Sequence, residues 1–314
     1  MARMVFQRFW TGFLVLFLVS VCVFFATQIL PGDAAQAILG RDATPERLEA
    51  LREQLQLSGN PIMQYWTWLG SVLQLDFGSS LANGRPVADL LGGRIVNSLI
   101  LMGAAALTGI PAALMIGVMT AYWRDGMLDH AVTVVTLVLS ALPEFVIATS
   151  LILLFATGIL KVLPATSTGS PVLSYPLQMV LPALTLALAI APYIIRMMRA
   201  TMIDVLESDY VQHARLSGLS ELKVVFRYGL VNALGAVAQV AALQLAYLAG
   251  GVVVVEYVFG FPGIGTALVD AVGNRDLPVI QATCLFIAVF YILVNLVADA
   301  LTAFANPRVR HAGR

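Results

Sequence analysis

Charged residues are scarce in this sequence, and their scarcity excludes most soluble folds. Only 11% of the 314 residues are charged, whereas 59% are apolar; soluble domains usually carry about 25% charged residues. Basic and acidic residues number 18 each, so the net charge gives no indication of a nucleic-acid partner. The charges cluster between long apolar runs, which is typical of a chain that crosses a hydrocarbon layer.

Residues that build metal, redox and hydrolytic sites are also few. The two cysteines, Cys22 and Cys284, lie inside apolar runs and form neither a disulfide framework nor a metal-site spacing. The sequence contains no Gly-x-x-x-x-Gly-Lys-Ser/Thr phosphate loop, no His-Glu-x-x-His and no Gly-x-Ser-x-Gly. We therefore expect no catalytic, cofactor or metal site in this chain.

Six apolar runs are each long enough to cross a membrane, which takes roughly 20 residues for about 30 Å of hydrocarbon. Backbone groups in lipid must form hydrogen bonds within their own segment, so each run is expected to be a helix. The predicted fold is an all-α integral membrane protein with six transmembrane helices. The runs are residues 9–30, 98–122, 131–155, 177–195, 233–255 and 279–302.

The basic residues predict the orientation of these spans. The first run is too long for the core of a cleaved signal peptide, which is about 7–15 residues, so we expect it to remain as a span. Six spans place both termini on one side, and most basic residues of the termini and short loops fall on that side. Because such residues favour the cytoplasm, both termini are predicted to be cytoplasmic. These residues are Arg3, Arg8, Arg124, Arg196, Arg199, Arg215, Lys223, Arg227, Arg308, Arg310 and Arg314.

Three segments are then extracytoplasmic. Residues 31–97 are predicted to contain an amphipathic helix at 45–57 that Thr44 caps, residues 161–176 form a proline-containing loop, and residues 256–278 begin with a tight apolar turn. We divide the chain into residues 1–94, the first span with its outside segment; residues 95–305, a core of five spans; and residues 306–314, a cytoplasmic tail.

The polar stretch at 196–227 predicts a docking element on the cytoplasmic side. Tyr210, Val211 and Ala214 give a short helix a small apolar face. Gly218 supplies a left-handed residue that ends the helix, and Ser220 is suited to cap the next one. An ordinary solvated loop is the alternative, but such loops seldom combine these features.

This stretch resembles the cytoplasmic loop of ABC-importer permeases, whose pattern is Glu-Ala-Ala, three residues, Gly, nine residues and Ile-x-Leu-Pro. Ala214, Gly218 and Leu230 agree with that pattern, whereas Gln212 and His213 depart from it. The dipeptide/oligopeptide/nickel branch of the family is a closer match. Seven segments of this sequence resemble that branch: Asp209-Tyr210-Val211, Gly218-Leu219-Ser220, Val254-Val255-Glu256-Tyr257-Val258-Phe259, Pro262-Gly263-Ile264-Gly265, Leu30-Pro31-Gly32-Asp33, Asp76-Phe77-Gly78 and Asn306-Pro307-Arg308.

The resemblance implies the type I ABC-importer fold in the inner membrane, in a transporter whose tasks are distributed over several subunits. It implies a second homologous permease, two ATP-binding subunits that hold ATP and Mg, and an extracytoplasmic solute-binding protein that delivers peptides or a related small solute. No nucleic acid is implied. The short helix would couple this chain to one ATPase, through Asp209, Tyr210, Val211, Gln212, His213, Ala214, Arg215, Gly218 and Leu219.

Polar residues inside the spans have more than one interpretation. Glu144 either faces the transport pathway and contacts a cationic group, or is protonated or bonded to backbone groups freed at Pro143. Gln239 and Gln244 are candidates for the pathway or for interhelical hydrogen bonds. Asn295 and Asp299 share one helix face, and we favour a packing role for them.

Four charged residues of the last outside segment are candidates for docking the binding protein: Glu256, Asp270, Arg275 and Asp276. A local salt-bridge network is the alternative.

The main rival function is a self-sufficient secondary transporter or channel that uses intramembrane carboxylates, and an intramembrane enzyme is a weaker one. The sequence shows no clear inverted repeat for the former and no catalytic constellation for the latter.

Overall fold

The computed structural model describes residues 2–29, 44, 60–158, 160–167, 169 and 171–305. The predicted helix at 45–57 and the motifs at 30–33 and 306–308 lie outside these residues. The regular structure of the described residues is helical. Among these residues, β-type pairing is limited to one isolated bridge between Ser79 and Pro86.

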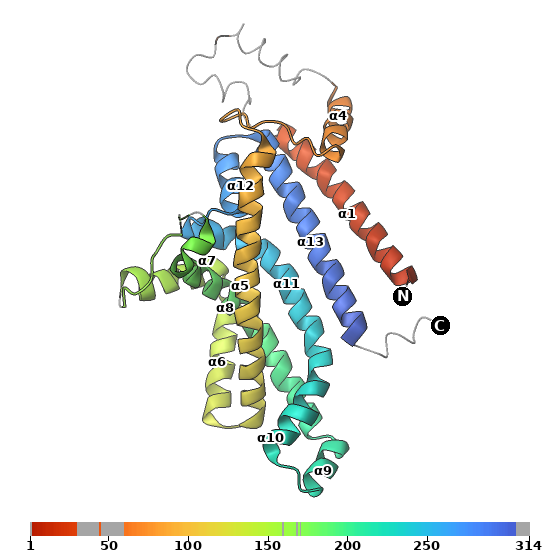
Figure 1. Ribbon diagram of the computed structural model, residues 1–314, viewed down its shortest axis with the longest axis vertical. Coiled ribbons are helices and arrows are strands. Elements are labelled where there is room, and N and C mark those ends of the chain that lie inside the picture. The colour runs from red at the N-terminus through yellow and green to blue at the C-terminus, as the bar shows by residue number, and fades with distance from the viewer. Residues whose placement is uncertain are drawn as a thin grey trace.

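Long helices run along the molecule (Figure 1), and five of them, among the described residues, are long and apolar enough to cross a membrane. They are α1 (Ala2–Ile29), α5 (Val87–Tyr122), α8 (Pro176–Leu206), α11 (Val231–Phe259) and α13 (Leu277–Ala305). Together with one bent pair of helices, they make up to six candidate membrane spans. The predicted all-α membrane fold is therefore confirmed.

The third apolar run differs from the single span that we predicted. It forms α6 (Met127–Ala141), α7 (Glu144–Leu151) and the π-helical turn η2 (Ile152–Thr157), with a 114° bend between α6 and α7. Leu142 is extended, with φ −92° and ψ 131°. The cause is Pro143, which has no N–H to continue the helix and forces the preceding residue out of the helical region.

The core is centred on α8, which packs against α5, α6, α7 and α11. Glycines let α5 approach it closely: a Cβ on Gly117 would lie 2.6 Å from the Cβ of Met198, and one on Gly109 would lie 2.8 Å from the Cβ of Ala187. Lipid is as apolar as these side chains, so close packing rather than exclusion of water holds such helices together.

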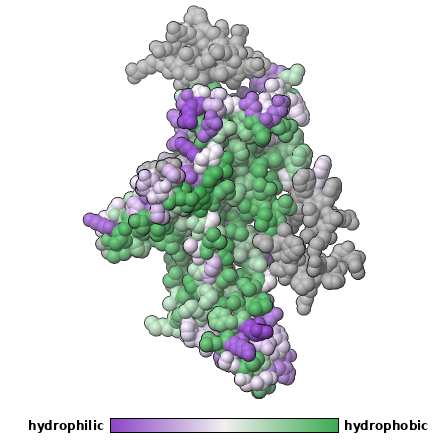
Figure 2. Space-filling view, viewed as in Figure 1, coloured by the Kyte–Doolittle hydropathy of each residue, from purple (hydrophilic) through white to green (hydrophobic). Residues whose placement is uncertain are grey.

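Short helices cover the two ends of the bundle. One end carries α9 (Asp209–Leu216), α10 (Glu221–Lys223) and the π-helical turn η4 (Val224–Leu230); the other carries α4 (Pro61–Leu73) and α12 (Ile264–Gly273). The 3-10 turn η3 (Val172–Ser174) precedes α8. Figure 2 shows apolar surface over the middle of the molecule and polar surface at both ends, as a membrane protein requires.

Candidate functional site

The helix α9 is fixed to the bundle by two small apolar side chains. Val211 and Ala214 are buried and belong to the same core as α8 and η4. Tyr210 is 46% exposed, although it lies four residues before Ala214 and so borders the same side of the helix.

The end of α9 has the predicted glycine stop. Gly218 has φ +79°, and its N–H donates to the Arg215 carbonyl at 2.9 Å. A Cβ at this position would meet no atom within 4 Å, so the backbone conformation and not the available space favours glycine. Ser220 does occupy the N-cap position of α10, but its side chain makes no capping hydrogen bond.

Ion pairs brace this end of the molecule. The Arg215 guanidinium donates to both carboxylate oxygens of Glu221, at 2.9 and 3.4 Å, and to the Leu206 carbonyl at 3.3 Å. Arg124, in the turn after α5, pairs with Glu207 beside α9. The buried carboxylate of Asp129 on α6 accepts two hydrogen bonds from Arg199 on α8, at 2.5 and 2.6 Å.

The outer face of α9 points away from the bundle. Tyr210, Gln212 and His213 are exposed, and Leu216 is 84% exposed. A short helix fixed on one face, ended by a rigid turn and exposing apolar groups on the other face, is suited to seat in a groove of another protein.

The opposite end contains a buried carboxylate network. Glu256, near the end of α11, is completely buried and accepts hydrogen bonds from the Ser98 hydroxyl of α5 and from the Gly265 N–H of α12, the latter at 2.6 Å. The Ser98 oxygen accepts from the Ile264 N–H at 2.9 Å. A Cβ on Gly265 would lie 2.5 Å from the Cα of Val253. Only a residue without a side chain fits between the two helices.

This network corrects the predicted docking surface. Glu256 cannot meet a binding protein, because the turn after α11 folds α12 over it. Asp276 is also buried, and accepts from the Ser80 hydroxyl and, at 3.0 Å, from the Leu81 N–H. Asp270 and Arg275 are exposed, and the carboxylate of Asp270 lies 3.8 Å from the guanidinium of Arg94. The pairing of Ser80 and Ser98 with these carboxylates was not predicted, because the serines are distant from them in sequence.

The candidate pathway residues are only partly brought together. Glu144 is half-buried at the first turn of α7, and its carboxylate accepts a hydrogen bond from the hydroxyl of Tyr247 on α11. Gln239 is exposed on α11, two turns before Tyr247. The side-chain oxygen of Gln244 is buried and has no hydrogen-bond partner among the described residues. Tyr247 was not predicted, since a tyrosine in an apolar run gives no signal by itself.

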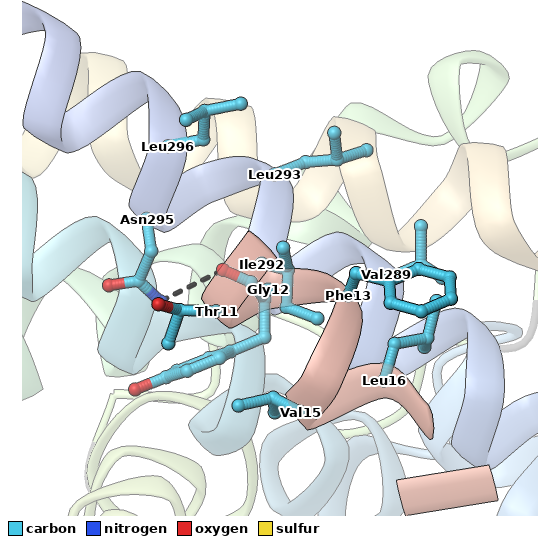
Figure 3. A pocket seen from close by; sticks show the side chains of 11 residues that line it. Thr11, Gly12, Phe13, Val15, Leu16, Val289, Ile292, Leu293, Asn295 and Leu296 are labelled. Carbon is cyan, nitrogen blue, oxygen red and sulfur yellow. Dashed lines mark hydrogen bonds between the residues drawn. The ribbon is translucent and has the colours of Figure 1, made fainter. Parts of the chain in front are cut away.

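A separate hollow of about 420 Å³ lies between α1 and α13 (Figure 3). Its lining is mostly aliphatic and aromatic, so it offers little to a charged ligand. Asn295 borders it, and its side-chain N–H donates to the Tyr291 carbonyl of the same helix at 2.9 Å. Gly12 lets α1 approach, because a Cβ there would lie 2.9 Å from Ile292. This hydrogen bond lies within the helix of Asn295, so the packing role that we favour stays a prediction; the side chain of Asp299 lies outside the described part of the chain.

Comparison with known proteins decides the family. The family described as binding-protein-dependent transport system inner membrane component matches residues 113–311, and the model of its N-terminal region matches residues 1–101. The chain belongs to this family. It is also 38% identical over 296 residues to the glutathione transport system permease protein GsiC of Escherichia coli (strain K12), which covers 94% of this chain and 95% of the relative. The proteins of that name from Shigella flexneri serotype 5b (strain 8401) and Shigella boydii serotype 4 (strain Sb227) are equally similar, at 38% over 296 and 298 residues.

The predicted ABC-importer permease is thus confirmed as a multi-pass protein of the inner membrane. The family's description as part of a binding-protein-dependent transport system implies in general that such a permease works with other subunits.

Proposed function

We propose that this permease is one of two homologous membrane subunits of an ATP-driven importer. Two ATP-binding subunits, which hold ATP and Mg, lie beneath the pair, and an extracytoplasmic binding protein delivers the solute. The observation that carries the proposal is α9, which is fixed on one side by Val211 and Ala214 and exposes Leu216 on the other.

The α9 end then faces the cytoplasm, together with both chain termini. Six spans put the termini on the same side as α9. The short connections at that end carry most of the basic residues, which favour the cytoplasmic side. Closure of the ATPases moves the groove that holds α9. Because Arg215 ties α9 to the end of α8 and to α10, the motion is transmitted to the spans rather than absorbed by the loop.

The proposed substrate is a short peptide of the glutathione type. The relatives at 38% identity are named for glutathione transport, and the motifs around Asp209 and Pro262 resemble those of peptide permeases. Selection among peptides falls largely to the binding protein, which is a different chain.

The test begins with the tagged chain in native membranes. Extraction in mild detergent should recover a second permease and ATP-binding subunits, which mass spectrometry identifies. The recovered complex with its binding protein, placed in lipid vesicles, should take up radiolabelled glutathione only when ATP is supplied. A chain that is recovered alone and transports without ATP would favour the secondary transporter instead.

A further inference from the structure

Glu144 occupies an unusual position for a carboxylate in an apolar segment. It is the first residue of α7, directly after the 114° bend at Pro143. The Tyr247 hydroxyl of α11 donates to its carboxylate. One turn along α11, Gly251 lies beside the acid, since a Cβ there would lie 3.4 Å from the carboxylate oxygen Oε1, an ordinary contact distance. The carboxylate therefore sits between α7 and α11.

The described chain does not balance the charge of Glu144. Glu144 forms no ion pair with an arginine or lysine in the described ranges; Arg196 of α8 lies over the ring of Tyr193, 5.4 Å from its centroid. A single neutral phenol donor leaves most of the acceptor capacity of a carboxylate unused. Charged groups in membrane segments usually pair or face a solvated cavity, and they mark substrate pathways.

The surroundings of Glu144 are open and aromatic. Tyr247, whose hydroxyl bonds to Glu144, is 49% exposed. Aromatic faces attract cations, and a carboxylate accepts charge-assisted hydrogen bonds from an ammonium group. A free anion or an apolar chain would gain little here.

We propose that Glu144 and Tyr247 form a subsite of the transport pathway that holds the ammonium group of the substrate. The proposal rests on the proposed importer function and names the part of the peptide that this chain itself recognises. Glu144 accepts hydrogen bonds from the ammonium group, while the Tyr247 hydroxyl fixes the carboxylate and its ring covers one side of the cation.

The test compares two substrates in the reconstituted complex: glutathione, and glutaryl-cysteinyl-glycine, which lacks the ammonium group. The ratio of their ATP-dependent uptake rates is measured for the unmodified complex and for Glu144→Gln, with the same saturating binding protein. The preference of the binding protein cancels between the two complexes. The ratio should fall about tenfold in Glu144→Gln, as expected for loss of a charge-assisted hydrogen bond, and less in Tyr247→Phe. Asp89→Asn, an exposed acid on α5, should leave the ratio unchanged.

The outcomes are distinct. An equal fall in both uptake rates, which leaves their ratio unchanged, would mean that Glu144 only supports the structure, and two unchanged rates would mean that it is remote from the ammonium group; either overturns the subsite while the importer function stands. Loss of assembly in Glu144→Gln would indicate a structural pair or a contact with the second permease and overturns it too. If the unmodified complex takes up neither substrate with ATP, the proposed function itself fails, and the subsite with it.

Discussion

The acidic residues next to α12 and those next to α9 differ in how they are held. At the α12 end, Glu256 and Asp276 are buried and accept hydrogen bonds from serine hydroxyls and backbone N–H groups of distant segments. At the α9 end, Glu207 and Glu221 are exposed and pair with arginines. Buried polar groups are costly to leave unpaired, whereas exposed ion pairs contribute about 0–1 kcal/mol.

The difference indicates which end is constructed for stability and which for contact. At the α12 end, removing one hydrogen-bonding group leaves others without partners inside the protein. At the α9 end, water can replace a lost partner of Glu207 or Glu221, so these positions are free to serve a docking surface, whereas Asp129 on α6 keeps a buried pair with Arg199. The predictions below test this contrast, in order of decreasing expected effect on stability.

Substituting Gly265→Ala should have the largest effect. The new methyl group would lie 2.5 Å from the Cα of Val253 and 2.9 Å from the Glu256 carboxylate, so α12 must move away from α11. We expect a loss of about 3 kcal/mol, the upper range for overpacking. The measurement is thermal unfolding of the purified complex. Gly273→Ala, at the end of the same helix with no atom within 4 Å, is the matched control and should not destabilise.

Substituting Glu256→Ala should cost about 2–3 kcal/mol, because it leaves the Ser98 hydroxyl and the Gly265 N–H without partners in the interior. The same change at the exposed acid, Asp270→Ala, should cost less than about 0.5 kcal/mol. Denaturation curves of the two variants give the comparison. Equal losses would show that Glu256 is not the centre of a buried network.

Substituting Gly218→Val should abolish ATP-driven uptake while it leaves the protein folded in the membrane. The left-handed backbone strains a β-branched residue by about 1–3 kcal/mol, and α9 responds by shifting its outer face. The variant should reach the membrane in normal amount, yet ATP hydrolysis should no longer drive uptake. Gly273→Val at the opposite end is the control for coupling. Normal uptake by Gly218→Val, with normal substrate-stimulated ATP hydrolysis, would count against a coupling role.

Substituting Arg215→Ala should have the smallest effect on stability, about 0.5 kcal/mol, because its pair with Glu221 is exposed. Glu221→Ala should cost a similar amount, and the double variant should show little further loss. Unfolding of the three variants in parallel measures this; a loss of several kcal/mol would mean that the α9 end is as tightly constrained as the α12 end.

The fold was largely predictable from the sequence, because apolar length alone determines which segments can span a membrane. For residues 131–155 we predicted one straight span and missed the bend at Pro143, since composition does not show how the two halves of an apolar run are oriented. At the α9 end, the helix and its Gly218 stop follow from local rules, so they were predicted correctly. At the α12 end, the burial of Glu256 and Asp276 depends on Ser98 and Ser80, more than 150 residues away, and no local pattern reveals such partners.

The most direct test of the importer function is cross-linking from α9. In a complex whose permease carries Cys22→Ala and Cys284→Ala, the exposed Leu216→Cys is joined to neighbouring lysines by a short thiol-to-amine reagent, and the product is identified by mass spectrometry. We predict a covalent product between this permease and an ATP-binding subunit, which Val272→Cys on the exposed face of α12 does not give. A Leu216→Cys variant that links to no ATP-binding subunit, or does so no more than Val272→Cys, would contradict the proposal that α9 couples the permease to ATP hydrolysis.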